Sequence, residues 1–201
     1  MLSSYRVLDL SDGRGIFCSK ILSDLGADVV QIEPPSGSPA RLIGPFYEND
    51  PDREKSLFWA CFANNKRGIT LNLESHYGRD IFRKLVASSH FLIESFRPGY
   101  LEHLGLSYRY MSDINPSLIY ISITPFGQNG PYNQYQATDL IGMALSGMMY
   151  LTGDPDRPPV RISTPQFWIT GSASAASGAM IASHYRILTG RGQHVDVSCQ
   201  Q

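Results

Sequence analysis

The start of the chain alternates strand-forming and helix-forming stretches, and this pattern restricts the fold more than any other feature. Residues 5–10 (YRVLDL) form an apolar strand pattern, residues 13–26 carry apolar side chains at helical spacing, and residues 28–33 (DVVQIE) form a second strand pattern. Two strands joined by a helix within about 30 residues pair in parallel through a right-handed crossover. The sequence therefore predicts an α/β fold built on a parallel sheet.

The same alternation continues to the end of the chain. Residues 34–52 are rich in proline, glycine and acids without periodicity, which predicts a long surface loop. A short apolar helix precedes a turn at Asn64 and Asn65. Further strands are expected at residues 69–73, 91–95, 117–124 and 195–199, and further helices at residues 79–87, 100–104, 108–114 and 164–188. The last helix is rich in Ala, Gly and Ser, which permits close packing, and residues 1–201 are expected to form one domain.

The composition of the chain bears on its partners and on its cellular location. The chain has 42% hydrophobic and 17% charged residues and a net charge of -1, which gives no argument for a nucleic-acid or anionic-membrane partner. We find neither a signal-peptide pattern nor an apolar run of transmembrane length. Cys18, Cys61 and Cys199 form no CxxC pair and are expected to be buried free thiols in a reducing compartment. We therefore expect a cytoplasmic protein.

Several loops that follow strands carry residues suited to a ligand. In open α/β sheets ligands gather at the carboxyl ends of strands. Residues 11–15 (SDGRG) combine two glycines with Arg14 at the start of a helix, which suits an anion, although the dinucleotide pattern GxGxxG is absent. Residues 64–67 (NNKR) supply two cations, and residues 95–99 (SFRPG) supply Phe96 and Arg97, which could stack on adenine and pair with phosphate. An ordinary solvated or core role is the alternative for each loop.

A later segment places one acid at the start of an apolar helix. Gly127 and Gly130 precede this segment and allow backbone amides to approach a ligand. Thr138 can cap the helix, and Asp139 falls in its first turn, where a negative charge is stabilised by the helix dipole. Two interpretations stay open: Asp139 stabilises the helix, or it is a catalytic or orienting carboxylate.

Metal and hydrolase chemistry find little support in the sequence. The five histidines have no metal-ligand spacing, so no metal site is predicted. Ser172, Ser174 and Ser177 lack the GxSxG context that would expose a nucleophile on a sharp turn.

Seven sequence blocks together resemble the family III CoA-transferases, which include formyl-CoA transferase, carnitine CoA-transferase and α-methylacyl-CoA racemase. The blocks are VLDLS, LGADVVQIEPP, NNKRGITLNL, ESFRPGYLEHLGLSY, INPSLIYISITPFGQNGPY, TDLIGMALSGMMYLTG and TGRGQHVDVS. The resemblance implies the N-terminal half of such a protein: a Rossmann-like CoA-binding domain of a chain about twice as long. The closing strand pattern, which stops almost as soon as it begins, fits the same expectation of a truncated chain.

The resemblance also implies a site. Coenzyme A or acyl-CoA would bind as a substrate, with no permanently bound cofactor. The positions that the family uses for CoA fall on Gly13, Arg14, Leu71, Asn72, Leu73, Ser95, Phe96, Arg97 and His103. The last of these is commonly arginine in the family, and a neutral imidazole holds phosphate less well than a guanidinium.

The resemblance fails at the reacting group. In the transferases an aspartate attacks the acyl-CoA thioester and later carries CoA to an acceptor carboxylic acid. The position of that aspartate falls on Trp168, and the histidine position of the racemases falls on Thr138, so the catalytic residue is unknown. Three hypotheses follow: a transferase that uses another carboxylate such as Asp139, a non-catalytic subunit paired with an Asp-bearing paralogue as in two-subunit benzylsuccinate-type enzymes, or a CoA-binding module without turnover. The assembly would be a homodimer or such a heteromer.

Overall fold

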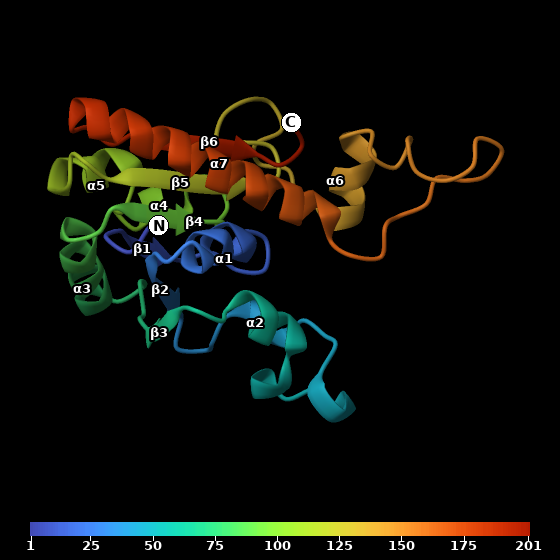
Figure 1. Cartoon of the computed structure of the whole chain (residues 1–201), viewed down its shortest axis with the longest axis horizontal. Helices are drawn as coiled ribbons and strands as arrows, with labels where there is room; N and C mark the ends of the chain where they lie inside the picture. Colours follow the sequence, from blue (N-terminus) through green and yellow to red (C-terminus); the bar gives the residue numbers. More distant parts are fainter.

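The computed structural model describes all 201 residues and contains one six-stranded parallel sheet with strand order β3-β2-β1-β4-β5-β6 (Figure 1). The strands are β1 (Arg6–Asp9), β2 (Asp28–Glu33), β3 (Arg67–Thr70), β4 (Phe91–Glu94), β5 (Ile119–Thr124) and β6 (His194–Ser198). Every neighbouring pair runs parallel. The predicted α/β class and parallel sheet are confirmed.

Helices cover both faces of this sheet, and an apolar core lies between the sheet and the helices on each face. The helices are α1 (Ile16–Asp24), α2 (Leu57–Phe62), α3 (His76–Ala87), α4 (Tyr100–His103), α5 (Tyr108–Ile114), α6 (Asp139–Leu145) and α7 (Gln166–Thr189). Val7 of β1 packs in one core with residues of α1 and α7, and Leu8 packs in the other core with residues of α3, α4 and α5. All residues of β4 and β5 are buried, as expected for central strands that are covered on both faces.

The small residues of α7 let this helix lie close against the sheet. A Cβ on Gly171 would come within 2.3 Å of Cys199 Sγ, which follows β6. Ala175 and Ala179 are fully buried in the core that α7 shares with α1 and the central strands. The expectation of close packing by this helix is confirmed. None of the helices is both long and apolar enough to cross a membrane.

Some predicted boundaries and environments were wrong. The strand expected at residues 69–73 starts at Arg67 and ends at Thr70, because Glu74 N donates to Asn72 Oδ1 and turns the chain. Residues 34–52 are not featureless but hold short 3₁₀ helices. All three cysteines are free, but Cys61 is exposed and Cys199 is only partly buried. Cys61 lies on α2, none of whose residues is buried.

α3 also begins earlier than the predicted residue 79. Ser75 caps it by accepting a hydrogen bond from Gly78 N at 3.0 Å, so the helix starts at His76. The cap was missed because the apolar periodicity that marks this helix begins only later in the sequence.

A buried ion pair joins the end of β1 to the residue that precedes β3. Lys66 Nζ lies 3.2 Å from Asp9 Oδ2 and 2.7 Å from Ser19 Oγ, and it also donates to Gln31 Oε1 at 3.2 Å. The Lys66 and Asp9 side chains are 1% and 0% exposed, and burial lowers the pKa of Lys66 despite the attraction of Asp9. Lys66 is therefore a structural residue and not a free cation for a ligand.

Arg67, the second cation of the same loop, is also engaged. Its guanidinium pairs with Asp28, the first residue of β2. The hypothesis that residues 64–67 offer two cations to a ligand was wrong for Lys66, which is buried and paired, whereas Arg67 is 64% exposed and shares Asp28 with Arg6.

Glu94, the last residue of β4, is a second buried carboxyl group at the carboxyl end of the sheet. It is 4% exposed, and its Oε2 accepts a hydrogen bond from Phe96 N at 2.7 Å. Burial raises its pKa to about 7, although hydrogen bonds from Ser122 and Phe96 act in the opposite direction. This group therefore changes its protonation near neutral pH.

Removing one member of the buried ion pair should destabilise the protein strongly. We expect Lys66→Ala to lower the free energy of unfolding by about 3–5 kcal/mol, because Asp9 would remain buried without its cation. Arg157→Ala, which breaks an exposed pair with Asp154, should cost less than about 1 kcal/mol. Urea unfolding of both variants checks the difference, and equal small losses would contradict the assignment. The double variant Lys66→Met, Asp9→Asn should recover part of the loss.

The raised pKa of Glu94 predicts a pH dependence of stability. The folded pKa of about 7 exceeds the unfolded value, so the folded protein holds this proton more tightly. The resulting stabilisation is complete below about pH 4.5 and is lost as the pH rises through 7. Relative to Glu94→Gln, the unmodified protein should lose about 2–3 kcal/mol of unfolding free energy between pH 5 and 8. Urea unfolding at a series of pH values checks this, and an equal dependence of the unfolding free energy on pH in the two proteins would contradict it.

Candidate functional site

The strand order places a crevice between the ends of β1 and β4. In the sheet, β2 and β3 lie on one side of β1, and β4, β5 and β6 lie on the other side. The loops after β1 and β4 therefore lead to helices on opposite faces, α1 and α4. Such a reversal point is where ligands bind in open parallel sheets.

The turn after β1 is held tightly against the loop after β4. A Cβ on Gly15 would lie 2.8 Å from Ser11 Cβ and 3.3 Å from Ser95 Cβ, so only glycine fits here without a shift. The Ser95 hydroxyl accepts a hydrogen bond from Asp12 N and donates one to Asp12 Oδ1, both at 3.0 Å. Ser95 thus fixes Asp12 and the turn that carries Arg14.

Arg14 is the charged residue at the centre of the crevice. Its Nε lies 2.9 Å from Asp12 Oδ1 and its Nη2 lies 2.7 Å from Asp12 Oδ2, which is a two-point pair. Burial acts to lower the pKa of Arg14, but Asp12 and the nearby Glu94 raise it overall. The Arg14 side chain is about one-third exposed and borders three hollows.

The first hollow, which we call the apolar pocket, has a volume of about 320 Å³. Leu71 and Leu73 form one wall, and the ring of Phe96 forms another, with its centroid 4.7 Å from that of Tyr100. Ser38 and Pro39, from the segment after β2, also line it. A pocket with leucine and aromatic side chains in its lining suits a planar heteroaromatic group.

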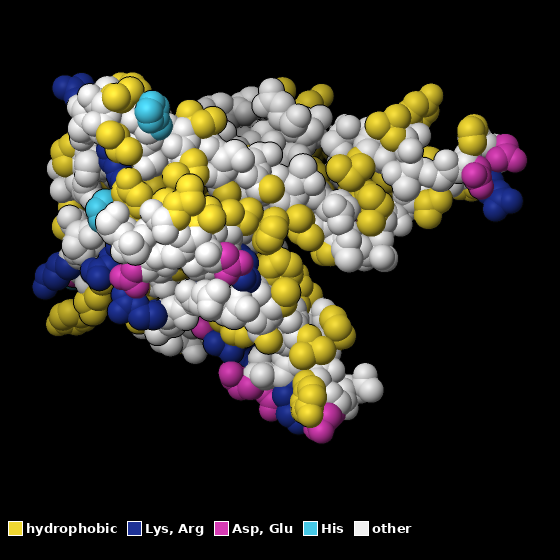
Figure 2. Space-filling view, in the orientation of Figure 1, with side chains coloured by type: hydrophobic (Ala, Val, Ile, Leu, Met, Phe, Trp, Pro, Cys, Tyr) yellow, Lys and Arg dark blue, Asp and Glu magenta, His cyan; other side chains and the backbone are white.

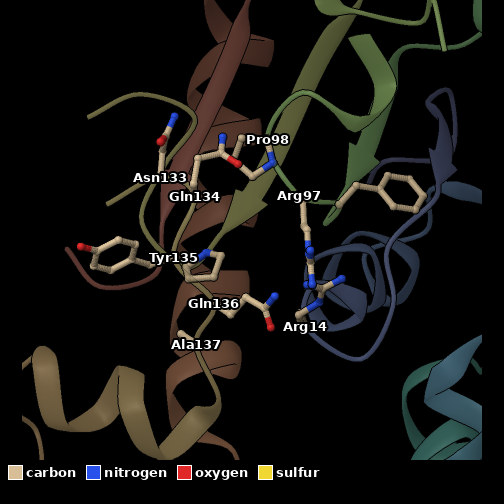
Figure 3. Close-up of a pocket in the computed structure, with 10 residues that line it drawn as sticks. Arg14, Arg97, Pro98, Asn133, Gln134, Tyr135, Gln136 and Ala137 are labelled. Atoms are coloured by element: carbon tan, nitrogen blue, oxygen red, sulfur yellow. The ribbon is translucent and has the colours of Figure 1, made fainter. Parts of the chain in front are cut away.

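The second hollow, which we call the arginine pocket, adjoins the first and shares Arg14 and Phe96 with it. Arg14 and Arg97 lie together on one side of it (Figure 3). Residues 133–137 supply the opposite side, and the volume is about 100 Å³. The Arg97 side chain makes no ion pair within the chain, so this pocket offers positive charge to an anion.

The third hollow, which we call the tryptophan pocket, lies on the other side of Arg14 and measures about 310 Å³. Gly13, Phe58, Pro165 and Trp168 line it. The Trp168 side chain is 8% exposed, and its ring packs edge-on against Phe167 at 4.8 Å. Only Asp12 brings a carboxylate to this pocket, and Arg14 already neutralises it.

Asp139 is buried close to Trp168 but is fully engaged. Its Oδ1 accepts a hydrogen bond from Phe167 N at 3.0 Å, and its Oδ2 lies 3.3 Å from Arg161 Nε. The predicted cap is present, since Thr138 Oγ1 accepts from Ile141 N at 3.4 Å. Asp139 therefore joins the start of α6 to the start of α7 and does not line any of the three pockets.

The structure brings most of the sequence-predicted residues together. Arg14, Leu71, Asn72, Leu73 and Phe96 line the apolar pocket. Gly13 lines the tryptophan pocket, and Arg97 lines the arginine pocket. Two residues lie apart: Ser95 is buried behind Asp12, and His103 is exposed on α4 without lining any of the three pockets.

Other residues of the site were missed by sequence reasoning. Asp12 and Glu74 border the apolar pocket, and the Tyr100 hydroxyl donates to Glu74 Oε1 at 2.6 Å. The loop after β1 carried a signal for Asp12, but nothing in the sequence indicated that Glu74 and Tyr100 meet. A further polar pocket contains Glu94, Tyr120 and His194, whose Nε2 lies 2.9 Å from Ser122 Oγ. No three His, Cys, Asp or Glu side chains gather closely enough to hold a metal ion.

Comparison with known proteins links this geometry to one family. The family model described as CoA-transferase family III matches residues 2–201. The chain is 42% identical over 197 residues to succinyl-CoA:(R)-benzylsuccinate CoA-transferase subunit BbsE of Thauera aromatica, covering 98% of this chain and 48% of that protein. It is 38% identical over 199 residues to the alpha subunit of succinyl-CoA–L-malate CoA-transferase of Chloroflexus aurantiacus, covering 98% of this chain and 46% of that protein.

A solved structure shares the fold over the whole chain. The CAIB/BAIF family protein from Brucella suis superposes with a TM-score of 0.93 at 35% identity, covering 99% of this chain and 53% of that one. The chain spans about half the length of the curated relatives it matches. The match of sequence, fold and length to the N-terminal half agrees with the resemblance seen in the seven blocks. The chain belongs to CoA-transferase family III.

Proposed function

We propose that this protein is one subunit of a CoA-transferase, and that it binds acyl-CoA while an aspartate of a partner subunit attacks the thioester. The reaction would transfer CoA between two carboxylic acids. In outline, the partner carboxylate displaces CoA to give a mixed anhydride, and the released thiolate then attacks the enzyme carboxyl carbon, which frees the first acid. The acceptor acid takes CoA by the reverse steps.

The observation that carries this proposal is the tryptophan at position 168. By family resemblance the nucleophilic aspartate belongs there, and an indole ring can neither attack a thioester nor carry CoA. The carboxylates nearby are already committed, Asp12 to Arg14 and Asp139 to Phe167 N and Arg161. A carboxylate from another subunit is the remaining route to the family's chemistry.

The three pockets around Arg14 provide a path for an extended ligand such as CoA. Adenine would lie in the apolar pocket against Phe96, and the diphosphate would lie between Arg14 and Arg97 in the arginine pocket. The pantetheine arm and thioester would then extend past Gly13 toward Trp168. CoA would be a substrate in this arrangement, and no other cofactor is required.

Exposed apolar side chains support assembly with a second chain. Figure 2 shows apolar side chains over α6 and the segment that follows it, which extends away from the sheet in Figure 1. Tyr150 and Leu151 in this segment are 88% and 84% exposed, and Leu145 of α6 is 57% exposed. Large apolar side chains that gather in one exposed region mark interaction sites. Two relatives are also named as subunits, which favours a heteromer over a homodimer, and we expect both subunits in the cytoplasm.

Exchange activity should require two different subunits. We expect the full-length protein alone to show no exchange of labelled acid into acyl-CoA, because it has no free carboxylate at the thioester. Mixing with a family III subunit that carries aspartate at the position of Trp168 should produce exchange. A partner in which that aspartate is changed to asparagine is the control and should restore nothing. Exchange by the protein alone would contradict the proposal, as would an inactive mixture.

The role of Asp139 can be separated from that of a nucleophile. Asp139→Ala should lower the free energy of unfolding by about 1–3 kcal/mol, because Phe167 N loses its buried acceptor. Asp139→Asn keeps an acceptor and should cost less. In the mixed enzyme, Asp139→Asn should retain exchange within about tenfold, whereas loss of a nucleophile costs on the order of a million-fold. A complete loss of exchange in a folded Asp139→Asn protein would make Asp139 the catalytic residue.

A further inference from the structure

The lining of the apolar pocket carries more negative than positive charge. Three acids border it, Asp12, Glu33 and Glu74, but Arg14 is the only cation that does. Coenzyme A carries a phosphate on the 3′-oxygen of its adenosine ribose, so a pocket that reads the whole adenosine end needs a cation for this group. The charges of the lining therefore bear directly on which adenosine the pocket accepts.

The cations nearest the pocket are already engaged, and the unpaired Arg97 belongs to the adjoining arginine pocket, where we place the diphosphate. Arg14 makes its two-point pair with Asp12. Arg41 pairs with Glu33 through Nε–Oε2 at 2.7 Å and Nη2–Oε1 at 2.9 Å, and it also reaches Glu54. Arg79, on the helix after β3, donates to the backbone carbonyls of Leu73 and Glu74. Releasing any of them would uncover a carboxylate or a carbonyl.

Glu33 remains negatively charged despite its burial. Burial acts to raise the pKa of Glu33, but hydrogen bonds from Arg41 and Ser38 N lower it overall. Its charge is compensated by Arg41, so the pair is neutral and attracts neither sign strongly.

Glu74 is different, because no cation compensates its charge. The group that contacts its carboxylate is the Tyr100 hydroxyl, at 2.6 Å. Burial and the Glu74 carboxylate raise the pKa of Tyr100 to about 12, so this hydroxyl stays protonated and keeps donating. The Tyr100 ring also packs at a tilt against Phe96, and the exposed Glu74 side chain borders the pocket in which we place adenine. A carboxylate beside an adenosine accepts a hydrogen bond from a free ribose hydroxyl, as in dinucleotide folds, but repels a ribose phosphate.

We propose that the apolar pocket reads the adenosine of CoA without its 3′-phosphate, and that Glu74 is the residue that discriminates against this phosphate. The proposal rests on the proposed function, since it concerns the same CoA site. It implies that 3′-dephospho-CoA and its thioesters bind this subunit with at least the affinity of CoA and its thioesters. His103 does not line the pocket and supplies no replacement for the missing cation.

The test compares CoA with 3′-dephospho-CoA by isothermal titration of the full-length protein. We expect dephospho-CoA to bind about 3- to 10-fold more tightly at low ionic strength, and the difference to shrink as salt screens the repulsion. Glu74→Gln, which keeps a hydrogen-bond acceptor but removes the charge, should abolish most of the preference. Glu74→Lys should reverse it.

A matched control removes an acid that lies outside the pockets. Asp113→Asn removes an exposed acid on α5 that lines none of the pockets, and it should leave the ratio of the two dissociation constants unchanged. If CoA binds tenfold more tightly than dephospho-CoA, the inference is wrong while the CoA site stands. If neither ligand binds, the placement of CoA in the proposed function fails, and the inference fails with it.

Discussion

The buried pair between Lys66 and Asp9 is the interaction on which the ligand-facing end of this fold depends. Lys66 Nζ meets the end of β1 through Asp9, the first turn of α1 through Ile16 O, and β2 through Gln31. Three elements thus converge on one ammonium group, which comes from the turn before β3. A buried pair adds little net stability compared with apolar packing, but an error in its geometry leaves a charge unsatisfied. We infer that the pair fixes where β1 ends, and therefore where the turn that carries Arg14 begins.

Arg14 in turn connects recognition to the reacting region. Its guanidinium borders the apolar, arginine and tryptophan pockets, and its partner Asp12 is fixed by Ser95 from the neighbouring loop. A ligand phosphate on Arg14 would have to share the guanidinium with Asp12. Because that pair is only partly exposed, it keeps the guanidinium oriented before any ligand arrives. The site is thus preorganised through ion pairs on the loops, while the sheet beneath supplies rigidity.

The sequence was sufficient for the parts of the structure that depend on local patterns. Alternating apolar stretches predicted the parallel sheet, and glycine, arginine and phenylalanine after the strands predicted most residues that line the pockets. The long-range polar contacts could not be predicted, because Lys66 and Asp9 are 57 residues apart and no pattern links them. The same holds for Glu74 and Tyr100, which are 26 residues apart. The strand end at Thr70 was missed because the side chain of Asn72, and not hydrophobicity, turns the chain there.

The packing of Trp168 against Phe167 restricts substitution at position 168. An aspartate introduced at this position would leave a void where the indole packs, and it would put a carboxylate into a largely buried site. Both changes cost several kcal/mol, since cavities and poorly solvated charges each destabilise a folded protein. A single Trp168→Asp substitution would therefore destabilise the protein before it could supply a nucleophile. If the proposed function is correct, the packing of the Trp168 ring keeps this subunit dependent on the aspartate of its partner.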